Sequence, residues 1–161
     1  MPIDFNKCRE GANGAVITPK CRLAYPSLFE PGLPPGETDQ DKATYNTVLL
    51  IPKDADTTLL KDLVAKTRDA EWTAAKQEDI KVKLPFKKTE DAKSLSKYAD
   101  EFPWHIRVAT KYKPGVVTPN ATATNDPEEA YSGRWGCASV NAYAWIHKTG
   151  GHGVSLNLNN V

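Results

Sequence analysis

The residues with the clearest potential for binding chemistry are aromatic and lie between residues 134 and 147. In an extended strand, successive side chains point to opposite faces. One set in this segment is small and apolar from Ala138 onward, as the inside of a tight barrel requires. The opposite set contains Trp135, Tyr143 and Trp145. Aromatic rings in a row on an open sheet face are costly unless they bind something, and stacking of nucleic-acid bases is one solution.

The same alternation also permits the opposite orientation, in which the three aromatic rings belong to the core. That orientation leaves Val140 and Ile146 outside and buries Ser139 and Asn141. The last predicted strand, residues 154–158, favours the first orientation, because its apolar residues alternate with Ser and Asn. Both orientations remain open from the pattern alone.

A second predicted strand, residues 102–112, presents cations in a similar way. Its even-numbered residues are predicted to face the core: Trp104, Ile106, Val108, Thr110 and Tyr112. The opposite face then carries His105, Arg107 and Lys111. Residues 81–113 contain nine Lys or Arg against four Asp or Glu, although the whole chain has a net charge of only +1. Such a basic segment favours contact with phosphates, with an ordinary solvated surface as the alternative.

Familiar catalytic and metal-binding patterns are missing from the sequence. The three histidines form no HxxxH pair, and neither a GxSxG nor a GxxxxGK[ST] string occurs. Cys8, Cys21 and Cys137 include no CxxC pair, so we interpret them as reduced thiols. Acidic residues concentrate in predicted loops and the helix, whereas a metal-dependent nuclease needs carboxylates converging at strand ends. We therefore predict no enzymatic activity, no metal and no cofactor.

The elements that must position these side chains are mostly short strands. Strands are predicted at residues 15–25, 44–51, 81–86, 102–112, 134–147 and 154–158, with a hairpin turn at 148–153. One helix is predicted from residue 57 to about 75, with Asp54 and Asp56 as candidate N-caps. Residues 1–14 are predicted to be loose, and long loops are predicted at 26–42, 87–101 and 114–130. The pattern indicates one domain spanning residues 1–161, a β-barrel or sandwich.

Several strings of the sequence carry a family resemblance. The most specific are YSG at 131–133, ASVNAYAW at 138–145 and GVSLNLNNV at 153–161, and the strings at 18–20, 25–29 and 49–53 fit with them. Together they resemble the phage single-stranded DNA-binding proteins, a family long catalogued as a domain of unknown function. The resemblance spans nearly the whole chain.

The resemblance implies a mainly β, OB-like Greek-key barrel of five to six strands with one helix and long loops. It implies binding and protection of single-stranded DNA, with little sequence preference, during phage replication or recombination. The expected DNA-binding residues are Lys20, Arg22, Lys53, His105, Arg107, Lys111, Tyr112, Lys113, Arg134, Trp135, Tyr143 and Trp145. We expect no membrane association, as no stretch of about 18 apolar residues occurs, and a location in the cytoplasm of the infected bacterial host. A small phage nuclease and a protein-interaction β-domain are the alternatives.

Three features depart from the resemblance. Cys137 stands where a basic residue is expected, which predicts one fewer phosphate contact. The predicted helix follows the second strand, earlier than in a standard OB order. The chain ends at Val161, directly after the last strand, where relatives continue into an acidic tail that recruits phage replication or recombination proteins.

Overall fold

The computed structural model describes residues 5–33, 38–39, 41, 43–73, 76, 80–92, 95–118, 122–124, 126, 128, 130–146 and 151–161. Within these ranges, ten strands form one sheet with one α-helix, α1 (Thr58–Glu71). The strands are β1 (Arg9–Glu10), β2 (Val16–Ile17), β3 (Cys21–Gly32), β4 (Thr44–Ile51), β5 (Val82–Lys83), β6 (Lys87–Lys88), β7 (Trp104–Thr110), β8 (Trp135–Gly136), β9 (Ser139–Ile146) and β10 (His152–Asn160).

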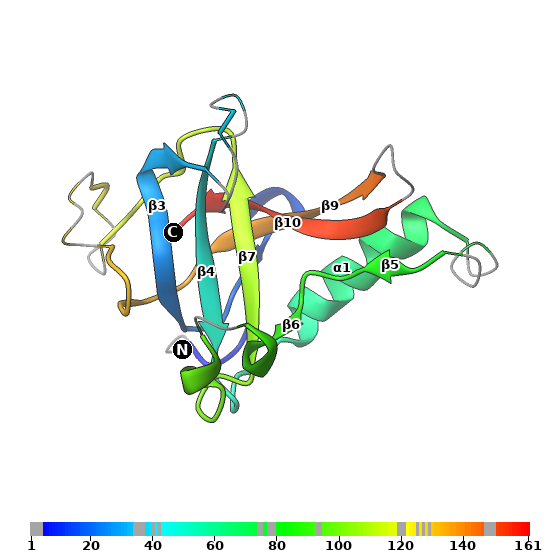
Figure 1. The fold of residues 1–161 in the computed structure, drawn as a ribbon, viewed down its shortest axis with the longest axis horizontal. Coiled ribbons are helices and arrows are strands. Elements are labelled where there is room, and N and C mark those ends of the chain that lie inside the picture. Colours follow the sequence, from blue (N-terminus) through cyan, green and yellow to red (C-terminus); the bar gives the residue numbers. More distant parts are fainter. Residues whose placement is uncertain are drawn as a thin grey trace.

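Five longer strands give the sheet its topology. They neighbour one another in the order β3-β4-β7-β10-β9, with β7 and β10 parallel and the other pairs antiparallel. Figure 1 shows β3, β4 and β7 side by side, with β9 and β10 running across them and out into an arm. Among the described residues the sheet does not close. The predicted mainly β, OB-like fold is confirmed, with more strands than the five to six expected.

The core lies on the concave side of this sheet because alternate residues of neighbouring strands fall in register. Leu23 pairs with Leu49, and Leu49 pairs with Ile106, and all three side chains are buried. Burying side chains of this size contributes about 1.5–3 kcal/mol each. Leu60 and Val64 of α1 close the same core from the side of the helix.

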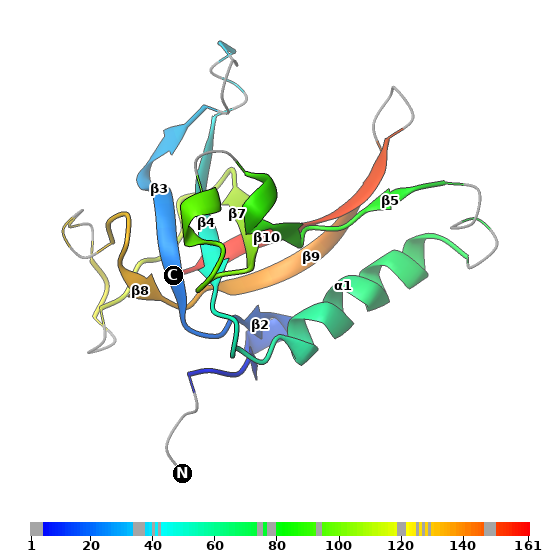
Figure 2. The same cartoon turned by 60° about the horizontal axis from the view of Figure 1, so that its bottom comes forward.

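Helix α1 begins close to where the sequence predicts, but its N-cap residue is Thr57 rather than Asp54 or Asp56. The Asp56 carboxylate accepts hydrogen bonds from the Thr58 amide at 3.0 Å and the Thr58 hydroxyl at 2.6 Å, and these bonds lower the pKa of Asp56. The helix lies along the arm formed by β9 and β10, as Figure 2 shows. It follows β4, which is the second of the five longer strands but the fourth strand of the chain, because β1 and β2 come before β3. No described helix is long and apolar enough to cross a membrane.

Several predicted boundaries are wrong. The segment expected as a loop at 26–42 contains the second half of β3, which pairs with β4 after a bulge near Tyr25, where φ is 49°. Extra residues of this kind bend a strand without ending its pairing. The loop expected at 87–101 contains β6 and two 3-10 helices, η3 (Thr89–Asp91) and η4 (Ser96–Tyr98).

Both ends of the chain also differ from the expectation. Residues 9–14, expected to be loose, form β1 and a 3-10 turn, η1 (Ala12–Gly14). The single strand expected at 134–147 is two strands: β8 pairs with β3, whereas β9 pairs with β2 and β10. Most of the hairpin turn predicted at 148–153 lies outside the described residues, although β9 and β10 do pair antiparallel.

Two residues predicted for the core of the 102–112 strand are exposed instead. Trp104 is the first residue of β7, and its ring lines a hollow beside α1. Tyr112 lies two residues beyond the end of β7, where strand alternation no longer fixes the side-chain direction. Ile106, Val108 and Thr110 are buried as predicted.

Candidate nucleic-acid interface

Strand register places several of the predicted aromatic and cationic side chains on one face of the sheet. Directly paired residues on adjacent strands point to the same side. Trp135 pairs with Arg22, Arg22 with Leu50, Leu50 with His105, and His105 with Lys87. These five residues alternate with core residues, so they lie on the convex face, which we call the outer face.

A second row on the outer face reaches the arm. Asn46 pairs with Ala109, Ala109 with Asn157, and Asn157 with Asn141. Tyr143, two residues beyond Asn141 on β9, therefore points to the same side. The orientation with outward aromatic rings is confirmed for this segment, because Ala138 and Val140 are buried.

The outer face is not one continuous platform, because residues 89–92 and 95–102, which we call the cover, lie over part of it. Leu95 and Phe102 pack onto Ala24 and Leu50, and these four residues form a second, smaller apolar cluster. The segment is anchored by hydrogen bonds from the Thr89 amide to the Pro103 carbonyl and from the Phe102 amide to the Tyr98 carbonyl. Two exposed patches remain, one on each side of this cover.

The central patch consists of Arg107, Lys111, Asn141, Tyr143, Trp145 and Asn157. Tyr143 is 48% exposed, and its strand partner is Ser155. Trp145 is half-buried: its ring lies over Gly153, and its Nε1–H donates a hydrogen bond to the Ser155 hydroxyl at 2.9 Å. A Cβ at residue 153 would lie 2.3 Å from the Trp145 ring, so glycine is required for this arrangement.

Asparagine side chains lie between the aromatic rings and the cations of the central patch. The Asn159 amide donates to the Asn141 carbonyl oxygen at 2.6 Å, and the Asn157 amide donates to Asn159 at 3.4 Å. Side-chain amides both donate and accept, so they can satisfy the edges of any base. Sequence reasoning did not select these residues, because Asn in a strand indicates only a polar face.

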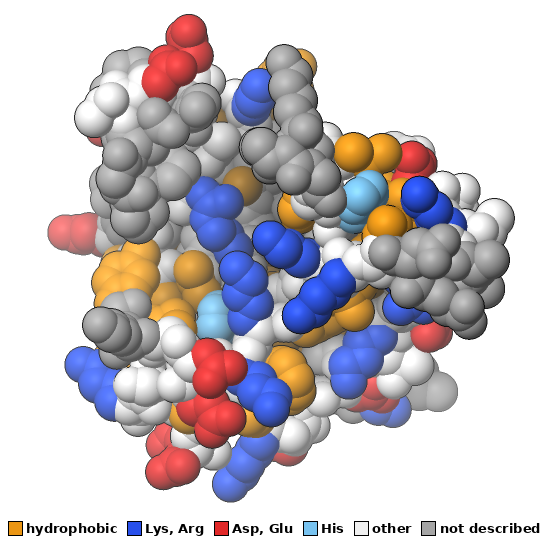
Figure 3. All heavy atoms as spheres, turned by 45° about the vertical axis from the view of Figure 1, so that its right-hand side comes forward, with side chains coloured by type: hydrophobic (Ala, Val, Ile, Leu, Met, Phe, Trp, Pro, Cys, Tyr) orange, Lys and Arg blue, Asp and Glu red, His pale blue; other side chains and the backbone are white. Residues whose placement is uncertain are grey.

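The strands of this face from β4 onward are free of acidic side chains, whereas the cover that lies on it carries Glu90, Asp91, Asp100 and Glu101. Arg107 and Lys111 are exposed, as predicted, and Lys83 lies beside Gly153 on the same face. Figure 3 shows Lys and Arg side chains gathered in a band across the middle of one face. Lys83 was not predicted as a site residue, although it belongs to the basic segment 81–113.

The edge patch consists of Trp135, Lys20 and Arg22. Trp135 is 41% exposed, and its ring contacts Phe102 with centroids 5.7 Å apart. The Lys20 ammonium and the Arg22 guanidinium lie 5.2 Å and 5.0 Å from the centroid of the Trp135 ring. Each cation–π contact contributes about 0.5–1 kcal/mol at an exposed site. The tryptophan therefore holds two cations together at the edge of the sheet.

His105 departs from its predicted exposed position. It is only 8% exposed, and its Nδ1 atom has no hydrogen-bond partner among the described residues. Burial, and then the neighbouring Lys87 charge, lower the pKa of His105. The imidazole is neutral at pH 7 and adds no positive charge to the surface.

The remaining predicted residues lie around these patches. Tyr112 and Lys113 are exposed just beyond β7. Arg134 stacks over the Tyr131 ring at 5.8 Å and lines a hollow next to Trp135. Lys53 lies away from both patches, in the hollow beside α1 that Trp104 also lines.

The cysteines are buried or half-buried free thiols. Burial raises the pKa of Cys8 to about 11, and burial likewise raises the pKa values of Cys21 and Cys137. Cys137, where a cation was expected, is therefore uncharged at pH 7. In the described part of the chain, no group of three His, Cys, Asp or Glu side chains could hold a metal ion.

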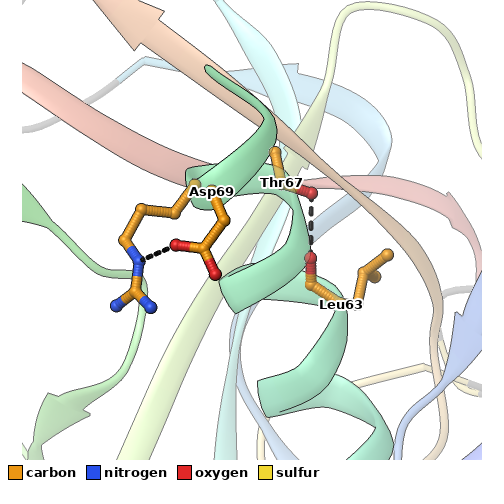
Figure 4. Close-up of polar contacts among 4 residues, drawn as sticks. Leu63, Thr67 and Asp69 are labelled. Carbon is orange, nitrogen blue, oxygen red and sulfur yellow. Dashed lines mark hydrogen bonds and ion pairs between the residues drawn. The ribbon is translucent and has the colours of Figure 1, made fainter. Parts of the chain in front are cut away.

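The surface of α1 has a different character from the outer face. The Arg68 guanidinium pairs with Asp69 at 3.1 Å, and the Thr67 hydroxyl donates to the Leu63 carbonyl at 2.9 Å, as the dashed lines in Figure 4 show. The charge of Arg68 is therefore partly neutralised within the helix.

Comparison with known proteins shows the family. The sequence profile described as "Enterobacter phage Enc34, ssDNA-binding protein" matches residues 14–161. No curated protein sequence matches the chain.

Solved structures show the same fold. The chain is similar to the single-stranded DNA-binding protein from bacteriophage Enc34 in complex with ssDNA, with a TM-score of 0.74, 20% identity, and coverage of 99% of this chain and 90% of that one. It is also similar to gp2.5, a single-stranded DNA-binding protein encoded by bacteriophage T7, with a TM-score of 0.64, 13% identity, and coverage of 93% and 91%. With its profile matched over nearly the whole length, the chain belongs to the Enc34 phage ssDNA-binding protein family.

Proposed function

We propose that this protein binds single-stranded DNA on the central patch, with cations contacting phosphates and aromatic rings stacking on bases. The observation that carries the proposal is the central patch, whose strands β7, β9 and β10 contain no Asp or Glu and where Arg107, Lys111 and Lys83 lie alongside Tyr143 and Trp145. Membership of the Enc34 family supports it. Tyr143 and Trp145 are about 6–7 Å apart along β9, a spacing that suits neighbouring bases of an extended strand.

The position of the patch agrees with the way OB folds hold oligonucleotides. These folds use the face of their second and third strands and the loop between the fourth and fifth. Here the second and third of the five long strands are β4 and β7, and β9 and β10 are the last two. The central patch extends from β7 to the end of β9, so bound DNA would cross the strands.

The proposed binding has little sequence preference, since every base has a face on which an aromatic ring can stack. The protein acts without catalysis or a cofactor and protects single strands during phage replication or recombination in the host cytoplasm. Replication or recombination proteins are the proposed protein partners.

The test is a titration of labelled oligo-dT at about 50 and 200 mM salt. We expect binding that weakens steeply as salt rises, because each neutralised phosphate of a single strand contributes about −0.7 to the log–log slope. Binding without salt dependence would favour a protein-interaction domain, and no binding at low salt would exclude the proposal. Loss of oligonucleotide length on adding Mg²⁺ would instead indicate a nuclease.

A further inference from the structure

A separate hollow lies next to the edge patch, away from the central patch. Its cavity volume is about 430 Å³, within the roughly 300–1,000 Å³ of small-molecule sites. The walls come from the N-terminal segment, β3, β8, the segment after β7 and the chain end. Phe5, Arg9, Lys20, Arg134 and Trp135 are the lining residues that matter for binding.

The chemistry of this cavity is cationic and aromatic. Arg9, Lys20 and Arg134 supply three positive charges, and none of the lining residues has an acidic side chain. The Arg9 guanidinium lies 5.3 Å from the Phe5 ring centroid, while its Nε atom is buried with no hydrogen-bond partner among the described residues. Phe5 is 49% exposed, so its ring is accessible to a ligand. A buried donor left without a partner is costly unless something binds it.

The cavity is continuous with the DNA-binding chemistry already described. Lys20 and Trp135 belong both to the edge patch and to the cavity wall. A strand that contacts Trp135 and Arg22 therefore meets the cavity directly, without crossing the cover.

We propose that this cavity is a second DNA subsite, which holds one nucleotide of the bound strand. The base packs against Phe5, and the flanking phosphates contact Arg9, Lys20 and Arg134. The inference rests on the proposed single-stranded DNA binding and adds a subsite that a strand held on the central patch reaches only when it is long enough to pass the cover and contact the edge patch.

The experiment compares two oligonucleotides, dT6 and dT16, on the full chain and on two variants. Phe5→Ala removes a half-exposed ring, and Arg9→Gln removes a charge while keeping a donor. We expect each variant to weaken dT16 binding roughly tenfold while dT6, which fills the central patch, binds as before. Arg9→Gln should also reduce the dT16 salt slope by about 0.7. The matched control is Lys61→Gln, a lysine in the hollow beside α1, which should bind both oligonucleotides normally.

Each alternative outcome has a distinct signature. If both variants bind dT16 like the unmodified protein, the subsite is wrong while the proposed function stands. If the unmodified protein binds neither oligonucleotide at low salt, the proposed function itself fails. Tight binding of an oligo-Glu peptide that both variants lose, with dT16 affinity unchanged, would assign the cavity to an acidic protein segment and overturn the subsite. If Arg9→Gln lowers the melting temperature, the dT16 affinity of Phe5→Ala alone decides whether the subsite exists.

Discussion

The central patch and the edge patch combine the same residue types in different arrangements. In the central patch, Tyr143 and Trp145 lie among neutral Asn and Ser side chains, with Trp145 fixed by Gly153 and Ser155. In the edge patch, the ring of Trp135 is already in contact with Phe102, Lys20 and Arg22. The first arrangement leaves Tyr143 available to bases, and the second concentrates charge where phosphates would lie.

This difference gives the aromatic rings of the two patches different roles in binding, which the alternation of residues in the sequence does not distinguish. An exposed ring among amides stabilises a complex through stacking, which does not depend on salt. A ring that holds two cations acts mainly by fixing their positions, so its removal also changes the electrostatic component. The salt slope of each variant therefore tests the comparison directly.

The largest loss of affinity is expected from the double variant Tyr143→Ala with Trp145→Ala. Each ring contributes roughly 1–3 kcal/mol of stacking, and the salt slope should stay that of the unmodified protein because no cation is removed. Titrations at four salt concentrations give both quantities. If the melting temperature falls sharply while affinity per folded molecule is kept, the two rings are structural.

Trp135→Ala should lower affinity for a long strand by roughly 1–3 kcal/mol and also flatten the salt slope. Lys20 and Arg22 lose the ring that positions them. Some loss of melting temperature is expected as well, because Phe102 loses its aromatic neighbour. A slope equal to that of the unmodified protein would place Trp135 in the same class as Tyr143 and remove the distinction between the patches.

Arg107→Ala with Lys111→Ala should cost about 1 kcal/mol at ~0.1 M salt, since exposed ion pairs contribute about 0.2–1 kcal/mol each. The clearer result is the salt slope, which should fall by about 1.4 for two phosphates. The loss should be about equal for dT and dC oligonucleotides, because phosphate contacts do not read sequence. The double variant Lys61→Ala with Lys66→Ala, two exposed lysines of α1, is the matched control for charge removed elsewhere.

The sequence predicts which residues of the alternating strands face the core, but it does not predict which segments pack onto the outer face. The small set at Ala138 and Val140 is buried as predicted, because a period of two holds along any strand. The prediction from this period fails at the ends of the strands. Ile146 is 62% exposed at the end of β9, and Tyr112 lies beyond the end of β7. The cover was not predicted, because its two 3-10 helices, η3 and η4, show no regular spacing of apolar residues. For the same reason, the division of the outer face and the burial of His105 could not be predicted.

The cavity beside Trp135 was beyond sequence reasoning for a different reason. Phe5 and Arg9 precede the first predicted strand, and no local pattern connects them with Arg134. Only the sheet, through β1, β3 and β8, brings these distant segments together.

Gly153→Ala is a smaller test of the central patch. The new methyl group would lie 2.3 Å from the Trp145 ring, so the ring must leave its place and lose its hydrogen bond to Ser155. We expect about 1 kcal/mol of affinity to be lost, with the salt slope unchanged. A double variant with Trp145→Ala should bind like Trp145→Ala alone. If the losses instead add, Gly153 acts independently of the ring.

The smallest effect is expected from His105, and it concerns the pH dependence of stability rather than affinity. Burial and the Lys87 charge lower the pKa of His105 in the folded chain. In the unfolded chain the pKa of this imidazole is about 6.5. As pH falls below that value, the unfolded state takes up a proton before the folded state does, so stability decreases. The decrease continues until the pH passes the lower, folded-state pKa. Above about pH 7 the imidazole is neutral in both states, and no contribution from it is expected.

His105→Gln should remove this component while keeping a polar side chain of similar size. Urea denaturation between pH 8 and pH 5 should show a smaller loss of stability for the variant than for the unmodified protein. His152 packs edge-on against Trp72, with ring centroids 5.8 Å apart, and His152→Gln is the matched control for replacing a histidine elsewhere in the fold. Identical pH profiles for His105→Gln and the unmodified protein would mean that His105 takes up its proton equally well in both states. DNA phosphates near Arg107 would favour the protonated form, so a rise in the His105 pKa on binding oligo-dT, followed by NMR, would place the strand beside β7.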